Sequence, residues 1–198
     1  MLSKLAIDEL ISIKKTLKEY YPMDVHPFEN LYENTREYKY RIEKVKFNAE
    51  ATKVLYNNFL LSLKSPGIFL AYDFTMIPYM HRCRTFIIKE SFSSSIAHIF
   101  HLSLLMPYYF SYTAILGKPN FPEAHLPGCL DFSNLEIVEN IFMDNIEQKI
   151  QIGFHVTKLN VNFLDEKIYD RVYIKENFRD DCTIFFGLFM DDYLMHSY

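Results

Sequence analysis

The sequence has no tryptophan, only five glycines, eight prolines and three cysteines among 198 residues. With so little Gly and Pro, and with 49% hydrophobic residues, it is not a collagen-like, low-complexity or disordered chain. The three cysteines, Cys83, Cys129 and Cys182, are odd in number, far apart and in no C-x-x-C pair, which excludes a disulfide framework. We therefore expect reduced thiols and a cytoplasmic protein.

Neither sign of charge dominates, since 21 basic residues face 25 acidic ones and the formal net charge is −4. Binding to a nucleic-acid backbone requires clustered Lys and Arg. The most basic stretch, Arg36 to Lys46, is interrupted by Glu37 and Glu43, which is typical of a solvated helix face. The sequence predicts no nucleic-acid partner.

Two segments of the sequence could indicate contact with a membrane: the N-terminus and the stretch 91–117. Lys4, Asp8 and Glu9 interrupt the N-terminal apolar residues, so we expect no signal peptide. The stretch 91–117 contains no Asp, Glu, Lys or Arg and is long enough to span a bilayer. Its histidines, serines and tyrosines, and the central Pro107, favour two buried strands joined by a bend, and no membrane contact.

Familiar catalytic motifs are also missing. The chain contains no GxxxxGK[ST], GxGxxG or GxSxG sequence, and its acidic residues lack the spacing of a calcium loop. Five scattered glycines cannot build a phosphate-cradling loop. We therefore assign no catalytic residue, no metal site and no cofactor.

Apolar spacing predicts three helices. Residues 2–20 carry one apolar stripe that ends before Pro22. Residues 35–64 also carry a helical stripe, preceded by a capping box of Asn34 and Glu37 and stopped at 65–67. Alternation around Tyr38 and Tyr40 leaves a strand followed by a helix as the alternative for this segment. A second capping box begins a third helix over about 133–150.

The remaining apolar segments are short and rich in β-branched and aromatic residues, which predicts strands. We expect four in meander order, at 68–75, 79–88, 96–106 and 108–116, and three more at 152–163, 168–175 and 182–190. The last is apolar on both faces, as in an interior strand. The predicted fold is α+β: a mostly antiparallel sheet of six to seven strands, two N-terminal helices and one inserted helix. We expect one globular domain over 1–198, helical over 1–65 and containing the sheet over 66–198.

Histidines, arginines and cysteines in the predicted strands and loops suggest a ligand pocket. On a strand, two arginines of the 81–84 segment share a face and could grip a carboxylate or phosphate. The H-x-x-H pair at 98 and 101 would share a face on a helix but occupy opposite faces on a strand, which leaves a common pocket open. The candidate ligand-binding residues are His81, Arg82, Arg84, His98, His101 and Cys129.

Acidic pairs near the C-terminus stand beside tyrosines. Such a surface would suit a basic protein partner. The candidate interaction residues are Tyr169, Asp170, Tyr173, Asp191, Asp192 and Tyr193.

Two functions follow from these patterns. The first is a non-enzymatic intracellular interaction module, of the inhibitor or immunity type, that docks a protein through the acidic, tyrosine-rich C-terminal surface. The alternative is a small-molecule binding protein or enzyme with a His/Arg/Cys pocket on the sheet. Phe and Tyr make up 17% of the chain, and a homodimer would bury any surplus that one core cannot hide.

Overall fold

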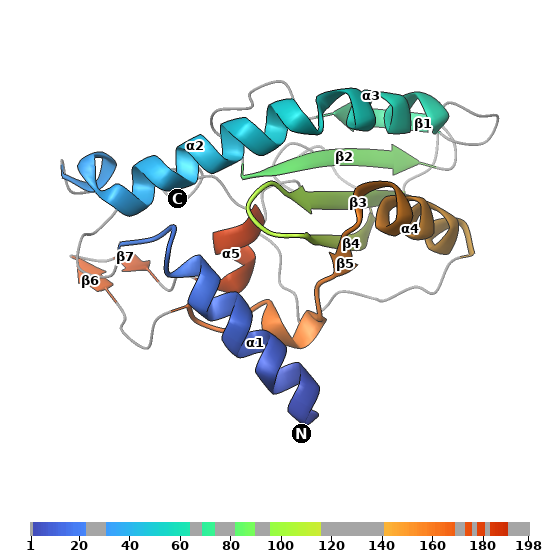
Figure 1. Cartoon of the computed structure of the whole chain (residues 1–198). Coiled ribbons are helices and arrows are strands. Elements are labelled where there is room, and N and C mark those ends of the chain that lie inside the picture. Colours follow the sequence, from blue (N-terminus) through green and yellow to red (C-terminus); the bar gives the residue numbers. More distant parts are fainter. Residues whose placement is uncertain are drawn as a thin grey trace.

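The computed structural model describes residues 2–22, 31–63, 69–73, 82–89, 96–115, 141–168, 173–175, 178–180 and 183–189. Its helices are α1 (Lys4–Leu17), α2 (Arg36–Ala51), α3 (Lys53–Ser62), α4 (Ile141–Phe154) and α5 (Ile184–Phe189), with 3-10 turns η1 (Tyr32–Asn34) and η5 (Val161–Phe163). Its strands are β1 (Phe69–Asp73), β2 (Cys83–Lys89), β3 (Ile96–Ser103), β4 (Tyr108–Ile115), β5 (Thr157–Lys158), β6 (Tyr173–Lys175) and β7 (Phe178–Asp180). The α+β class predicted from the sequence is confirmed (Figure 1).

A meander of four antiparallel strands, β1 to β4, forms the centre of the protein, and the two-residue β5 pairs in parallel with β4. The uncharged 91–117 segment supplies β3 and β4, joined by a turn that contains Pro107, as predicted. In the described residues of the chain, no helix has both the length and the apolarity needed to cross a membrane.

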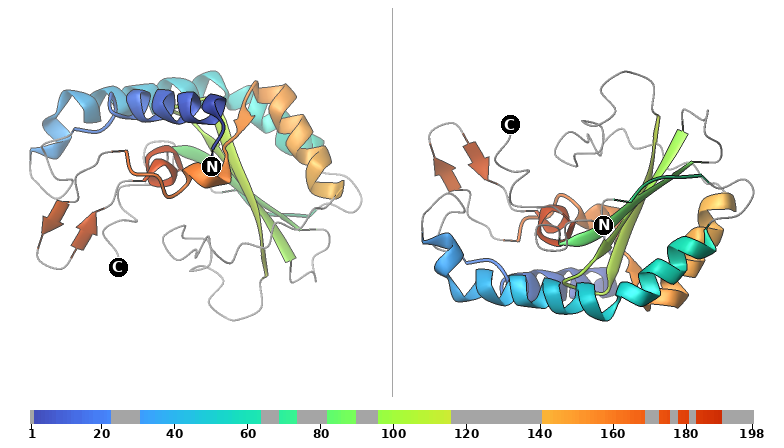
Figure 2. Two further views of the ribbon diagram at one scale, coloured as in Figure 1. Left: turned by 90° about the horizontal axis from the view of Figure 1, so that it is seen from below. Right: turned by 90° about the horizontal axis from the view of Figure 1, so that it is seen from above.

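The sheet has a hydrophobic core on each face, because its strands alternate two sets of apolar residues. On one face, β2 to β4 pack against α1, α5 and the first half of the α2–α3 rod. On the other face, Phe86 and Phe100 stack with ring centroids 4.9 Å apart, beneath α3 and α4. Helices α2 and α3 follow one another along one edge of the molecule and so contribute to both cores (Figures 1 and 2).

The helix expected over 35–64 is divided at Thr52, whose backbone (φ −97°, ψ 0°) leaves regular helical geometry. Arg84 Nη2 donates to the carbonyl of Ala49 and to Thr52 Oγ1, while Thr52 Oγ1 donates to the carbonyl of Asn48. These side chains bind carbonyls at the end of α2, which favours a break. The described part of the N-terminal region therefore holds three α-helices, and the prediction of two was wrong. The cap of α2 is Thr35, one residue after the predicted Asn34.

The predicted sheet of six to seven strands was also wrong. Residues 152–154 continue α4, only 157–158 form a strand, and 161–163 form a 3-10 turn. Strands β6 and β7 make a separate hairpin. The 182–190 segment contains the helix α5, which is buried against α1 and the sheet. A run that is apolar at every position has neither helical nor strand periodicity, so its packing decides its structure.

Two glycines provide a matched test of this packing. A Cβ added at Gly187 of α5 would lie 2.7 Å from Ile168 Cδ1 and 3.3 Å from Leu17 Cδ1, whereas at Gly153 of α4 it would meet no atom within 4 Å. We expect Gly153→Ala to raise the free energy of unfolding by about 0.5–1 kcal/mol through helix propensity. Gly187→Ala should lower it by about 1 kcal/mol, because overpacking exceeds that gain. Urea denaturation measures both, and a Gly187→Ala protein as stable as Gly153→Ala would contradict this packing of α5.

Candidate functional site

The two histidines of the H-x-x-H pair occupy opposite faces of β3. His98 Nδ1 lies 3.0 Å from Thr113 Oγ1, on the α4 side of the sheet. His101 Nδ1 lies 2.8 Å from Thr85 Oγ1, on the α5 side. Both residues are buried. They do not share a pocket, and the question left open by the sequence is answered by the strand geometry.

His101 belongs to a buried polar cluster with Cys83. The Cys83 thiol lies 3.9 Å from His101 Nδ1 and donates to the carbonyl of Phe189, 3.0 Å away. The rings of Phe185 and Phe189 pack against the imidazole. Burial lowers the pKa of His101 from 6.5 to about 3. The buried imidazole is neutral and is not exposed to a substrate in solvent. We therefore assign this cluster a structural role in the core.

Arg82 stacks at 4.8 Å over the ring of Tyr21, next to a buried arginine of α2. This second arginine, Arg41, is 1% exposed and lies 4.7, 5.7 and 5.0 Å from the ring centres of Tyr21, Tyr32 and Tyr38. Desolvation alone would lower the pKa of Arg41, but the facing tyrosines outweigh it and raise that pKa. The group joins the segment that follows α1, η1, α2 and the residue before β2, and most of its side chains are buried in the protein.

Arg84, one of the candidate ligand-binding residues, lines a pocket. This pocket, of about 280 Å³, lies beneath the α2–α3 break, beside the β3–β4 turn and the end of α4. Arg84 itself is buried and stacks at 4.5 Å on Tyr56. The described lining residues are Lys44, Asn48, Thr52, Arg84, Leu102, Ser103, Leu104, Leu105, Met106, Pro107, Phe154 and Val156.

Other predicted site residues lie outside the described residues of the chain. This holds for His81, Cys129, Tyr169, Asp170, Asp191, Asp192 and Tyr193. Tyr173 begins β6, but its side chain is not described. The acidic, tyrosine-rich surface therefore stays a prediction.

A second polar cluster ties α4 to β4. Glu147 accepts hydrogen bonds from Tyr109 (3.1 Å) and Ser111 (2.5 Å) and pairs with Lys158 at 2.6 Å. Ser111 is buried and the carboxylate is already neutralised by Lys158, which is the arrangement of a structural tie. Among the described residues, no three His, Cys, Asp or Glu side chains gather as metal ligands would.

The outer face of α2 and α3 carries a feature that the sequence reasoning missed. Tyr40, Phe47, Val54 and Leu61 are spaced seven residues apart and are 45%, 69%, 71% and 58% exposed. Seven residues are almost two helical turns, so Tyr40 and Phe47 lie on one side of α2 and Val54 and Leu61 on one side of α3. The ring of Tyr40 also stacks on that of Tyr20, with ring centroids 5.4 Å apart. We call these four residues the outer stripe. Its signal was present in the sequence as a second apolar row beside the buried one.

Comparisons with family models, curated protein sequences and solved structures gave no match for this chain. Its function is therefore inferred from the residues and their geometry.

Proposed function

We propose that the protein is a non-enzymatic interaction module, of the inhibitor or immunity type, that docks another protein through the outer stripe. The observation that supports this is the exposure of four large apolar side chains at a regular seven-residue spacing on α2 and α3. Seven residues rise about 10.5 Å along a helix, so the four side chains form a spaced apolar row of the kind that the apolar face of a partner helix can contact.

The helices beneath the stripe are well anchored. Val45 and Ala49 of α2 are buried in one core, and Tyr56, Phe59 and Leu63 at the α3 end are buried in the other. The outer stripe is therefore held in place before a partner arrives, and little conformational entropy is lost on binding.

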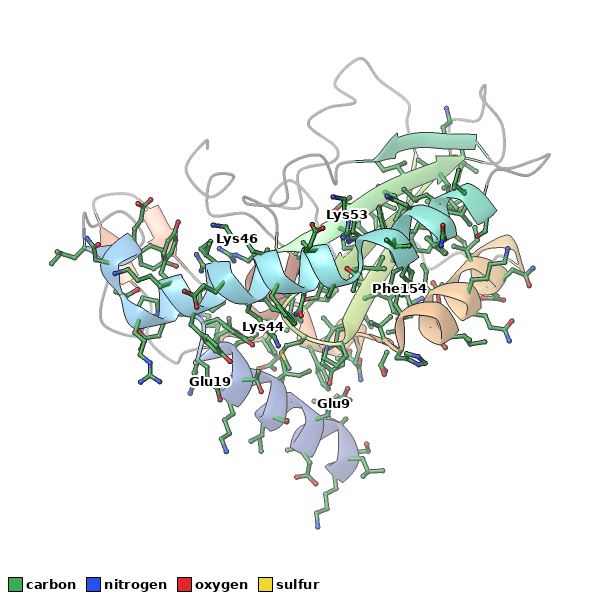
Figure 3. The ribbon with its side chains drawn as sticks, turned by 45° about the horizontal axis from the view of Figure 1, so that its top comes forward. Glu9, Glu19, Lys44, Lys46, Lys53 and Phe154 are labelled. Atoms are coloured by element: carbon green, nitrogen blue, oxygen red, sulfur yellow. The ribbon has the colours of Figure 1, made fainter. Side chains whose placement is uncertain are left out.

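Charges beside the stripe indicate the kind of partner. Lys39, Lys46 and Lys53 are exposed and repeat along one flank, on the opposite edge of the helix from Lys44, as the labelled lysines in Figure 3 illustrate. Glu43 and Glu50 lie between this row and the stripe, and Glu50 pairs with Lys53 at 3.7 Å. An amphipathic helix with acidic residues along one flank would complement both the apolar stripe and the lysine row.

A second copy of this chain fits the stripe less well. If two α2–α3 rods met face to face across a two-fold axis perpendicular to them, each flank would meet its own copy. The lysine row would then face a lysine row, and like charges would oppose pairing. We therefore favour a different protein, in the reducing cytoplasm that the cysteine pattern suggests, over the homodimer.

The alternative function is a small-molecule binding protein or enzyme with a His/Arg/Cys pocket on the sheet. His98 and His101 lie on opposite faces and so would not act together in it, whereas Arg84 lines the pocket beneath the α2–α3 break.

Affinity capture from cells of the source organism tests the proposal. The bait proteins are the wild type, Phe47→Asp in the outer stripe and Ile152→Asp on α4, which is 68% exposed and so matches Phe47. We expect the wild type and Ile152→Asp to recover the same partner in similar amounts. Phe47→Asp should recover at least about tenfold less, as for a buried aromatic hot spot.

Two outcomes would contradict the proposal. One is recovery of the same partner by Phe47→Asp and the wild type in equal amounts. The other is a wild-type dimer in light scattering that Phe47→Asp converts to a monomer, because the stripe would then be occupied by a second copy. Circular dichroism of each bait confirms that it is folded.

A further inference from the structure

We propose that the pocket beneath the α2–α3 break binds a small organic anion, a carboxylate with an apolar tail. This site is separate from the outer stripe, since its helical residues Lys44, Asn48 and Thr52 lie on the flank of the rod that faces the sheet. Its support comes from the chemistry of the lining and from the shape of the β3–β4 turn.

The polar groups of the lining favour an anion. Lys44 and Arg84 provide two cations, and no described lining residue is a carboxylate. Lys44 is half-buried, and no Asp or Glu among the described residues lies within ion-pair distance of it. A half-buried ammonium lined on one side by apolar groups gains more from an anionic ligand than an exposed lysine does.

Ser103, the last residue of β3, adds a hydroxyl to the lining of the same pocket. Ser103 Oγ accepts hydrogen bonds from the backbone amides of Leu105 (3.2 Å) and Met106 (3.3 Å). Its lone pairs are thus engaged, which leaves the hydroxyl proton to donate to a ligand. Asn48 Nδ2 donates to the carbonyl of Leu104, 2.6 Å away, and fixes the turn against α2.

The rest of the lining is apolar, which favours a ligand with an apolar tail. The end of β3, the β3–β4 turn, the end of α4 and the residue before β5 contribute these side chains. Figure 3 labels Phe154 on α4 and Lys44 on α2. A volume of about 280 Å³ suits a ligand of modest size, at the lower end of natural ligand pockets. A lining that combines cationic and hydroxyl donors with apolar side chains matches a short-chain carboxylate. The apolar lining residues are Leu102, Leu104, Leu105, Met106, Pro107, Phe154 and Val156.

Calorimetric titration with octanoate, octylammonium and octan-1-ol tests the proposal, because the three probes share a tail and differ in charge. We expect octanoate to bind in the micromolar to millimolar range and to shift the backbone amide resonances of Leu105 and Met106. Octylammonium should not bind. Octan-1-ol should bind at least about tenfold more weakly than octanoate, because it cannot form charge-assisted hydrogen bonds with the cations of the pocket.

Two matched variants locate the site. Lys44→Met keeps the apolar stem of the lysine, and we expect it to weaken octanoate binding by about tenfold. Lys46→Met removes an exposed lysine from the opposite edge of the same helix and should leave binding unchanged. The proposal is overturned if octanoate fails to bind at millimolar concentration, if octylammonium binds equally well, or if both variants weaken binding alike. None of these results bears on the outer stripe, which the capture experiment tests.

Discussion

Acidification from pH 6.5 to pH 4 is expected to lower the free energy of unfolding by about 3 kcal/mol through His101 alone. This imidazole has an ordinary pKa of 6.5, and burial lowers that pKa to about 3 in the folded protein. Between these values the unfolded chain binds a proton that the folded protein excludes, so stability falls as the pH falls. More than about one pH unit above 6.5 the imidazole is neutral in both states, and the contribution of His101 no longer changes with pH.

The groups that face His101 cannot offset this loss. Thr85 and Cys83 lie within hydrogen-bond reach of its Nδ1, and the Tyr112 ring stacks on it at 5.7 Å. None of them carries a negative charge at acid pH, and burial raises the pKa of Tyr112 still further. Urea denaturation at several pH values between 6.5 and 4 measures how steeply the free energy of unfolding falls with pH, which we call the acid slope.

A pair of variants separates His101 from the carboxylates that titrate over some of the same range. His101→Gln is expected to be less stable at pH 7 but to lose about 3 kcal/mol less than the wild type on acidification. His155→Asn is the control, because His155 is exposed and its left-handed backbone (φ 53°) suits asparagine. Equal acid slopes in the wild type and His101→Gln would mean that His101 is not sealed in the core.

Replacement of Arg41 by alanine is expected to destabilise the protein by about 3–4 kcal/mol. The guanidinium lies over three tyrosine rings and donates to Tyr32 Oη at 3.0 Å, so truncation removes these contacts and leaves a cavity. Because the segment after α1, η1, α2 and the residue before β2 meet at this cluster, we expect the loss to appear as a lower midpoint in chemical denaturation. Such a loss is a large fraction of a typical domain's stability.

A second variant distinguishes charge from packing. Arg41→Met keeps most of the side-chain volume but not the cation, and we expect a loss of about 1–2 kcal/mol from the missing cation–π contacts. Arg36→Ala removes an exposed arginine from the same helix and should change stability by less than about 0.5 kcal/mol. If Arg41→Met were as stable as the wild type, the stacked guanidinium would contribute no net stability, and only its volume would matter.

Most of the regular elements could be predicted from local patterns, because their periodicity and boundaries agreed. The stripe over 2–20 became α1, and the four meander segments became β1 to β4. Where a segment fitted more than one structure, its tertiary contacts determined which structure formed. The α2–α3 break depends on Arg84, which lies far along the chain from Thr52 and which no local window includes. The α5 segment is apolar throughout, so its sequence shows no periodicity that would distinguish a helix from a strand.

The candidate sites were less predictable than the fold. Arg84 was selected for its charge, but its neighbour Lys44 became a candidate only once the β3–β4 turn was seen beneath α2. His98 and His101 form an H-x-x-H motif that could have shared a pocket, but on a strand their side chains lie on opposite faces of the sheet, in separate cores. The outer stripe has a regular spacing in the sequence, but only the exposed fractions distinguish it from the buried row beside it.

Site-specific photo-crosslinking in cells of the source organism tests the docking proposal most directly. A benzophenone amino acid placed at position 47 or 54 puts the reactive ketone on the outer stripe, and the same residue at position 152 serves as an equally exposed control. We predict one crosslinked product of defined mass, containing a different protein, from positions 47 and 54 and not from position 152. The proposal would be contradicted by no product from either stripe position, by the same product from all three, or by a crosslink to a second copy of this chain.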